Sequence, residues 1–410
     1  MVRRRHVFYV EGYDPQGFDG YIALFQREFA RFLKLWPLQA TMSQPEVDRV
    51  AHTARWTMTA AAPNWRVDTG YEMMAWHDLP QADLAKPFPA RLPGIVATYG
   101  SFLFTGALVR IFRASWRFGL FFLYPAIMML LGVAVAAVVA SAVTELLAGH
   151  GNGIARTVGA AAAVAVAVAA IPFLKHYFVL QLAQMWVFVR DQIKGRRPDF
   201  DRRVDDFATR IIARAGAADT DEIVVVGHSC GGLVAMLAVA RALERDPRLG
   251  DHGPKLVLMS LGSIMAAAAL HPAGHEVRRA IERLANTPTI AWLKFQSRKD
   301  VINVFKFDPV AALDIPLRGP RHNPTVIAVR FADCLEPSTY LRFRNNFFRM
   351  HFQFIMANDR RAPYDYFLYL LGPAPLADWP AGQWDLLARF GDDAAFTTSP
   401  QSCAQTTAPA

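Results

Sequence analysis

The sequence predicts an α/β protein with a mostly parallel sheet, helices on both faces of that sheet, and an inserted transmembrane helical hairpin. In the second half of the 410-residue chain, short apolar runs rich in β-branched residues alternate with helical patterns. This alternation is typical of a parallel sheet covered by helices. Two long stretches without charge interrupt the pattern, and each approaches the length that a bilayer-spanning helix needs. Hydrophobic residues make up 53% of the chain and charged residues only 19%, which also favours membrane contact.

The first part of the chain, residues 1–90, is expected to contribute the first strands of the sheet. His6–Val10 is a short apolar run that ends in a Gly-Tyr-Asp-Pro turn, so we interpret it as a buried strand. Apolar residues at helical spacing predict a helix over Tyr21–Leu35. Trp56–Ala60 and Trp65–Trp76 are typical of two further strands.

Residues 91–197 are expected to form a membrane-associated insertion. The predicted transmembrane helices are about 118–143 and 157–180, joined by a short Gly-rich link, and the second requires Lys175 to extend its amine toward the interface. A buried helical hairpin in a soluble core is the alternative interpretation. The uncharged stretch Leu92–Val109 contains a proline and glycines, so we expect an interfacial or re-entrant segment there and not a span.

The flanking charges of this hairpin predict its orientation. Arginine and lysine residues cluster before the first span and after the second, whereas the link between the spans carries only Arg156. The positive-inside rule then predicts that both termini, and everything outside the hairpin, lie in the cytoplasm. Arginine greatly outnumbers lysine and alanine is abundant, which is typical of a GC-rich bacterial genome, so the expected location is a bacterial inner membrane.

Charge and cysteine content argue against nucleic-acid binding, a disulfide-bonded fold and a cysteine metal site. The net charge of +9 is explained by attraction to anionic lipid head groups, and we find no nucleic-acid motif. Cys230, Cys334 and Cys403 are widely spaced, with no disulfide framework and no metal-ligand spacing. A reducing compartment fits this pattern, and we recognise no signal peptide in the basic N-terminus.

After the insertion, residues 198–372 are expected to complete the sheet, and 373–410 to form a partly disordered tail. Helical patterns are predicted over Asp205–Ala215 and Leu233–Leu243. Apolar runs predict four strands, which are the run from Glu222 to Gly227, Lys255–Ser263, Thr289–Ser297 and Thr325–Asp333.

The first of these strands ends in the sequence Gly-His-Ser-Cys-Gly-Gly, which runs directly into an apolar helix. A nucleophile at Ser229 would occupy a crowded turn, so the positions two residues away must lack bulk, as Gly227 and Gly231 do. The start of the helix directs backbone N–H groups toward developing negative charge, and the N–H of Cys230 is the expected oxyanion donor. The alternative is a tight strand-to-helix turn with an incidental serine.

This turn resembles the nucleophile elbow of the α/β-hydrolase superfamily, whose triad follows the chain order Ser, Asp or Glu, His. The resemblance implies an acid just after the second strand beyond the elbow, which is Asp300; Asp308 is a second choice that better fits an Asp-Pro turn. It also implies a histidine beyond the next strand, where His351 is the only one. Each residue also has a non-catalytic interpretation, in which Asp300 belongs to a solvated loop and His351 packs among phenylalanines in the core. We interpret His228 as structural.

The superfamily takes its second oxyanion donor from the loop after an earlier strand. The turn after His6–Val10 resembles the His-Gly turn of lipases and esterases, with Tyr13 in place of the residue after glycine. The sequence departs from the family here, because two strands normally precede this one and only the first few residues of the chain do so. Either those strands are absent, or the segments near Trp56 and Trp65 fill other sheet positions.

The resemblance implies a membrane-anchored serine hydrolase that cleaves an acyl ester through an acyl-enzyme, with no metal or organic cofactor. A lipid-like or long-chain substrate is favoured, because the hairpin would hold the enzyme at the bilayer. The expected partners are therefore the lipid bilayer and the ester, with no nucleic acid. A non-catalytic membrane scaffold that retains the fold, and a thioesterase or acyltransferase with the same triad, remain as alternatives.

Overall fold

The computed structural model describes residues 1–378 and 385–398, and the chain divides into two compact units. The first unit combines Met1–Gln81 with the chain from Gly195 onward, and the second is Ala82–Lys194. The second unit therefore occupies nearly the same residues as the insertion predicted at 91–197. Cys403 and the end of the predicted disordered tail lie outside the described residues.

A nine-stranded mixed sheet forms the centre of the first unit. Its strands are β1 Arg4–Val10, β2 Gln39–Met42, β3 Glu46–Asp48, β4 Thr53–Ala62, β5 Trp65–Met74, β6 Glu222–His228, β7 Lys255–Leu261, β8 Ile290–Gln296 and β9 Thr325–Ala328. The spatial order is β2-β4-β5-β1-β6-β7-β8-β9, with β3 paired to β4. All pairings from β5 across β1 to β9 are parallel, and β4 is antiparallel to each of its partners. The prediction of an α/β fold with a mostly parallel sheet is confirmed.

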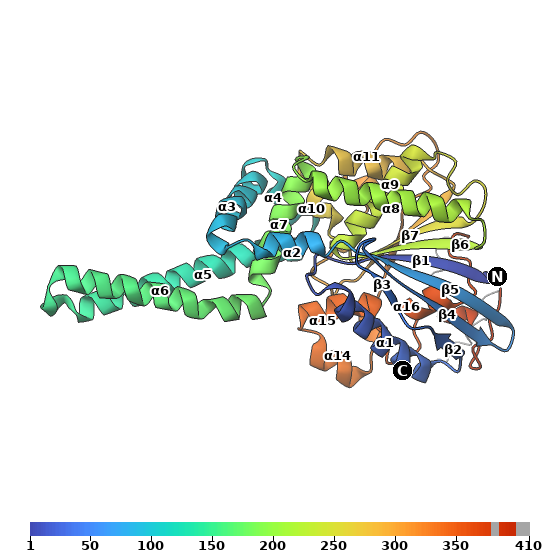
Figure 1. Ribbon diagram of the computed structural model, residues 1–410, viewed down its shortest axis with the longest axis horizontal. Coiled ribbons are helices and arrows are strands. Elements are labelled where there is room, and N and C mark those ends of the chain that lie inside the picture. The colour runs from blue at the N-terminus through green and yellow to red at the C-terminus, as the bar shows by residue number, and fades with distance from the viewer. Residues whose placement is uncertain (379–384, 399–410) are drawn as a thin grey trace, which may run out of the picture. The chain divides into compact units, whose positions relative to one another are not determined.

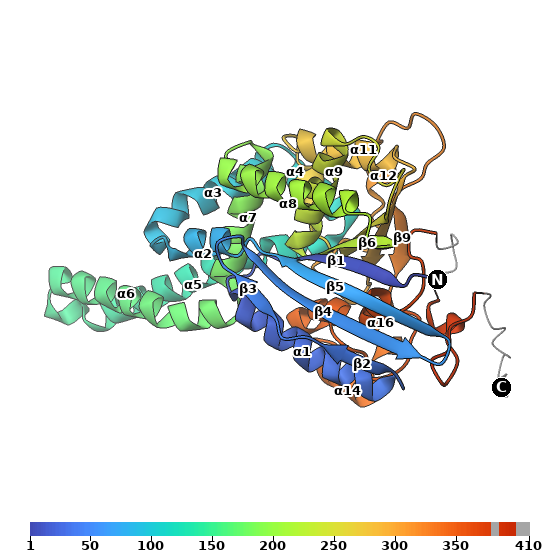
Figure 2. The ribbon, with the colours of Figure 1, turned by 45° about the vertical axis from the view of Figure 1, so that its right-hand side comes forward.

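Helices cover both faces of this sheet, as Figure 2 shows. One face packs against α1 Gly17–Leu35 and α16 Tyr366–Leu371, whose aromatic residues share one core with β1, β4 and β5. The other face is covered by α8 Pro198–Gly216, α9 Cys230–Arg245 and α11 His275–Ala285. The remaining elements that begin in this unit are α2 Asp78–Ala85, α10 Met265–Leu270, α12 Pro309–Ala312, α13 Phe331–Cys334, α14 Pro337–Phe343, α15 Phe347–Phe352, η2 Gln353–Ile355 and η3 Leu387–Arg389.

The hairpin of β4 and β5 fills the side of the sheet beyond β1. β5 pairs with β1 in parallel, so β1 lies between β5 and the strand β6 that ends in the serine turn. The two segments near Trp56 and Trp65 therefore fill sheet positions although they follow β1 in the sequence. β2 and β3 were not predicted; they have four and three residues, lie at the edge of the sheet and contain no buried residue, so no apolar run marks them in the sequence.

The chain beyond residue 372, which was predicted as a tail, contributes to the core of the first unit. Leu376, Phe390 and Phe396 belong to its hydrophobic cluster. A buried ion pair between Arg5 and Glu222, with 2.7 Å between Nη2 and Oε2, joins β1 to β6. The same Arg5 guanidinium donates to backbone carbonyls of residues 370–374, which fixes this segment against the sheet.

The second unit is helical. Its elements are α3 Phe88–Phe104, α4 Ala107–Ala114, α5 Trp116–Leu146, η1 Ala148–His150, α6 Asn152–His176 and α7 Val179–Ile193. The long helices α5 and α6, of 31 and 25 residues, contact each other along a hairpin (Figure 1). At about 1.5 Å per residue each exceeds the roughly 30 Å of a bilayer core. Both are long and apolar enough to cross a membrane, as predicted.

The second long helix ends earlier than the predicted limit at residue 180. α6 stops at His176, and Phe178 adopts a left-handed backbone conformation with φ of 57°. The apolar sequence that follows forms the separate helix α7, most of whose residues are buried. Hydropathy alone does not distinguish a membrane span from a helix buried in protein, so the sequence did not reveal this break.

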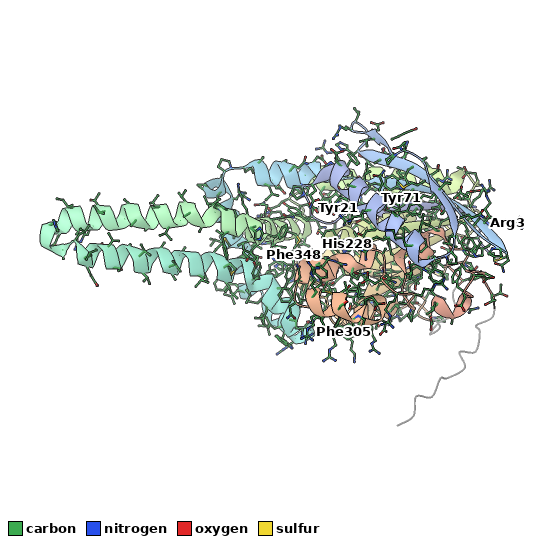
Figure 3. The ribbon with its side chains drawn as sticks, turned by 90° about the horizontal axis from the view of Figure 1, so that it is seen from below. Arg3, Tyr21, Tyr71, His228, Phe305 and Phe348 are labelled. Carbon is green, nitrogen blue, oxygen red and sulfur yellow. The ribbon has the colours of Figure 1, made fainter. Side chains whose placement is uncertain are left out.

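The two ends of the hairpin differ in burial. Near its start, Phe118 and Phe122 of α5 pack around Trp186 of α7, with ring centroids 6.0 and 4.8 Å from that indole. Farther along α5 the apolar side chains are exposed, and Leu130 reaches 68%. Figure 3 shows the side chains of both long helices projecting outward from the pair. An exposed apolar surface of this length is typical of lipid contact.

Candidate active site

Ser229 lies at the turn between β6 and α9, where the sequence placed a nucleophile. Its φ is 59° and its ψ is −124°, a backbone conformation that costs an ordinary residue on the order of 1–3 kcal/mol. Every residue of β6 is buried and Cys230 is buried, whereas Ser229 itself is partly exposed. The turn therefore presents this hydroxyl at the carboxyl edge of the sheet and buries its neighbours.

The two flanking glycines have no room for a side chain. A Cβ on Gly227 would lie 2.3 Å from the carbonyl oxygen of Gly231, and one on Gly231 would lie 2.2 Å from the carbonyl oxygen of Val10. All of these contacts are to backbone, so no side-chain movement relieves them. The crowding predicted for the turn is present, and it arises because β6, α9 and the end of β1 approach closely.

The N-terminus of α9 begins beside the serine. Cys230 is the first residue of this helix, and the first N–H groups of a helix lack an acceptor within it. Burial raises the pKa of the Cys230 thiol well above its ordinary value, so that thiol stays neutral near neutral pH. Its backbone N–H, and not its sulfur, is the group available to a negative oxygen.

The structure brings Asp300 and His351 together from different parts of the chain. Asp300 lies in the loop after β8 and His351 on α15, and Nδ1 of His351 donates to Oδ2 of Asp300 at 2.8 Å. Both side chains are almost fully buried. The backbone N–H of Ile302 donates to Oδ1 of Asp300 at 2.9 Å and holds the carboxylate in place. Asp308 instead caps α12 and pairs with Arg321, consistent with its interpretation as an Asp-Pro turn.

The other nitrogen of this imidazole is Nε2. Nε2 of His351 is buried and makes no hydrogen bond within the described residues, so it is not bonded to Ser229. Because Nδ1 donates to a carboxylate, Nε2 is the nitrogen with a free lone pair. The arrangement leaves a proton acceptor on an imidazole whose tautomer is fixed by Asp300.

His228, interpreted from sequence only as structural, contacts this imidazole directly. The two rings lie 4.5 Å apart, and Nε2 of His228 lies 3.2 Å from the backbone carbonyl oxygen of His351. Gly262, at the end of β7, approaches from another side, because a Cβ there would lie 3.0 Å from Cε1 of His351. This contact between two tilted rings places His351 beside the residue that precedes Ser229.

The loop after β1 lies against the serine turn. A Cβ on Gly12 would lie 3.2 Å from Cβ of Ser229, and Tyr13 is buried with its ring centroid 5.9 Å from that of Trp76. From the sequence we expected Gly12 and Tyr13 to lie beside the nucleophile. The structure brings this loop to Ser229, and the carbonyl of Gly12 accepts from the N–H of Asp14 at 2.9 Å.

Sequence reasoning missed the carboxylate that fixes this loop. Glu11 is fully buried, and its Oε1 accepts from the backbone N–H groups of Trp76 and His77 and contacts Nδ1 of His77 at 3.0 Å. The indole N–H of Trp76 donates to the Glu11 carbonyl at 2.8 Å. Burial raises the pKa of Glu11. The signal in the sequence that could have revealed this role is an acidic residue directly after an apolar strand.

The geometry thus contains a protruding serine, a buried carboxylate–imidazole pair and backbone N–H groups at the start of a helix. Among residues 1–378 and 385–398, no group of three or more His, Cys, Asp or Glu side chains is placed to hold a metal ion. The fold and site define the class of protein as α/β, with a mixed and mostly parallel sheet and an inserted pair of long apolar helices. No protein-family model, curated protein or solved structure matches this chain.

Proposed function

We propose that this chain is a membrane-anchored serine hydrolase that cleaves an acyl ester with Ser229, His351 and Asp300. The observation that carries the proposal is the buried pair of Asp300 and His351, with 2.8 Å between Oδ2 and Nδ1 and an unpartnered Nε2. Such a pair is a general base whose orientation is fixed. Ser229 is the partly exposed hydroxyl on the adjoining strained turn.

In the proposed reaction, Nε2 of His351 takes the Ser229 proton while Oγ bonds to the acyl carbon. The carbonyl oxygen becomes an oxyanion that accepts from N–H groups at Cys230 and near Tyr13. The ester C–O bond then breaks, and the imidazolium returns its proton to the leaving alcohol. Water repeats the sequence, releasing a carboxylic acid and restoring the serine, while Asp300 stabilises the imidazolium throughout.

The strand arrangement supports a likeness to the α/β-hydrolase superfamily. The serine turn follows an inner parallel strand, and the candidate acid and histidine follow later strands in the expected order. In the superfamily, two strands normally precede the strand that corresponds to β1. In this chain β4 and β5, which follow β1 in the sequence, fill the sheet positions beyond β1. The sheet position of each element, and not only its order in the sequence, therefore supports the likeness.

The two long apolar helices favour a substrate that partitions into membranes. An enzyme anchored in a bilayer meets long-chain esters there at high local concentration, so we propose a lipid-like or long-chain acyl ester. Basic residues near both ends of the hairpin favour, by the positive-inside rule, a catalytic unit on the cytoplasmic side, and we propose a bacterial inner membrane.

The test is labelling of the detergent-solubilised full chain with a fluorophosphonate, which phosphonylates an activated serine. We expect the wild type to be labelled, and Ser229→Ala and His351→Ala not to be. Ser338→Ala and His322→Ala change exposed residues of the same types and are the matched controls, which should be labelled like the wild type. A folded wild type that resists labelling would refute the enzyme and favour a scaffold with a hydrolase-like fold.

If labelling succeeds, the substrate class follows from a second experiment. Esters and thioesters of increasing chain length are compared in detergent micelles with the wild type and Ser229→Ala. A preference for long oxygen esters and release of free acid support the proposal. Transfer of the acyl group to an added alcohol instead of water would identify an acyltransferase, and a preference for thioesters would identify a thioesterase.

A further inference from the structure

The second unit carries an unbalanced positive charge on the side of the hairpin that begins the first long helix. No acidic residue occurs between Asp83 and Glu145. The cations in this interval are Lys86, Arg91, Arg110, Arg113 and Arg117. A helical segment of this length without a single carboxylate is suited to an anionic surface.

A sharp bend lies within this interval. α3 and α4 meet at 73°, and Gly106 at the junction has φ of 71°, a left-handed conformation that favours glycine. At the bend, Leu103 is 55% exposed and Phe104 is 88% exposed. A phenyl ring presented so fully to solvent at the tip of a bend is unusual unless an apolar medium covers it.

The outer face of α4 combines cationic and apolar groups. Ala107 and Ile111 are its buried residues, whereas Val109, Arg110 and Arg113 are exposed. Immediately afterwards the exposed indole of Trp116 begins α5, and the guanidinium carbon of Arg117 lies 5.5 Å from its ring centroid. Arginine and tryptophan side by side at the start of a long apolar helix are typical of the head-group layer of a membrane.

The contacts of α3 argue against a third span. NH1 of Arg190 on α7 donates to the backbone carbonyl of Gly94 at 2.7 Å, and its guanidinium pairs with Asp191 at 2.6 Å. The first half of α3 also packs through Ile95 against Val187. Because α3 is fixed beside this charged part of α7, a position in hydrocarbon would be very unfavourable for it.

We propose that residues 103–117, here named the interfacial bend, lie in the head-group layer and bind the phosphates of anionic phospholipids. In this arrangement Phe104 and Trp116 enter the upper acyl region, and Arg110 and Arg113 contact lipid phosphates. The exposed rings and the direct continuation into α5 favour lipid over a soluble polyanion. The inference rests on the membrane hairpin of the proposed function and is independent of Ser229.

The first test measures lipid selectivity of the full chain in nanodiscs that contain phosphatidylcholine and phosphatidylglycerol. Native mass spectrometry compares how strongly each lipid is retained by the wild type, by Arg110→Gln/Arg113→Gln, and by a control pair. Arg49→Gln/Arg66→Gln makes the same change in charge at two exposed arginines of the first unit. We expect the Arg110/Arg113 variant to lose on the order of 10- to 30-fold in preference for phosphatidylglycerol. Equal loss in the control pair would overturn the proposal.

The second test measures how deeply residue 104 lies in the bilayer. An environment-sensitive label is attached to Phe104→Cys in a Cys403→Ser background, since Cys230 and Cys334 are buried. Lipids with a nitroxide near the head group should quench it more than lipids with a nitroxide at the chain end. Stronger quenching by the deep nitroxide would mean that α3 and α4 form a span, and no quenching would mean that the bend lies in water; either result overturns the proposal.

A label at Val135→Cys, an exposed position within α5, reports whether the hairpin itself is inserted. Deep quenching there is expected. Its absence would overturn both the membrane anchor and the interfacial bend while leaving the serine-labelling result unaffected, so the failures are distinguishable.

Discussion

Replacing Gly227 by alanine adds one methyl group at the most crowded point of the serine turn. The new Cβ would lie 2.3 Å from the carbonyl oxygen of Gly231, and 2.7 Å from its carbonyl carbon and from Cα of Gly232. All three atoms belong to the backbone of the first turn of α9. Relief therefore requires α9 to move away from β6, and this movement displaces Ser229 from the edge of the sheet.

The size of the effect follows from the overlap. Ordinary contacts of this kind are about 1 Å longer, and overpacking a core costs typically about 1–3 kcal/mol, so a clash with three backbone atoms belongs near the upper limit. The first unit has about 300 residues, so at about 2.1 cal/mol/K per residue a loss of about 3 kcal/mol lowers its melting temperature by roughly 5 °C. We expect a fall of this size together with loss of fluorophosphonate labelling.

Thermal unfolding in detergent, followed by intrinsic fluorescence, measures the shift. Gly216→Ala is the matched control, because Gly216 ends helix α8, has no atom within 4 Å of its added Cβ, and does not have a positive φ. That variant should be neutral or more stable by about 0.4–1 kcal/mol. If Gly227→Ala melts at the wild-type temperature and is labelled normally, the crowding argument for the turn is wrong.

Three further predictions follow from the buried polar groups. Asp300→Asn removes the carboxylate that orients His351, so the rate of serine labelling should fall on the order of 10³- to 10⁴-fold; an unchanged rate would exclude Asp300 as the acid. Glu11→Ala leaves buried N–H groups without an acceptor and should lower the free energy of unfolding by about 2–3 kcal/mol in a denaturant titration, whereas wild-type stability would show that the loop does not depend on it. Burial lowers the pKa of Lys294 from 10.5 to about 7, so between these values the unfolded state binds more protons and wild-type stability should rise with pH. Lys294→Met should remove up to about 1.4 kcal/mol per pH unit of this rise, and melting temperatures with the same pH dependence in both proteins would contradict it.

The parts of the fold that the sequence predicted are those with a strong local signal. The run before Gly227 is apolar throughout because β6 is buried on both faces of the sheet. The association of Asp300 with His351 was implied by the resemblance to the α/β-hydrolase superfamily, whose chain order requires a histidine after the last parallel strand, where the sequence has only one. Long uncharged stretches identified α5 and α6, because charged residues are rare in helices long and apolar enough to cross a membrane.

The features that escaped prediction depend on contacts between distant segments. The break at Phe178 lies inside an unbroken apolar run, and only packing separates α6 from α7. The role of Glu11 requires Trp76 and His77, which come from the end of another strand. The contact of His228 with His351 joins residues that are far apart in the chain. None of these relations leaves a periodic pattern in the sequence.

The position of the insertion has a topological reason. β5 and β6 lie on opposite sides of β1 and both run parallel to it, so the chain that leaves the carboxyl end of β5 must return to the opposite edge before β6 begins. A connection between parallel strands needs a long crossover in any case, and α8 supplies the helix that packs on the sheet before β6. The entropic cost of closing a longer connection grows only with the logarithm of its length. The residues from Ala82 to Lys194 therefore lengthen a crossover that the sheet already requires, and none of the sheet pairings around β1 or the serine turn is interrupted by it.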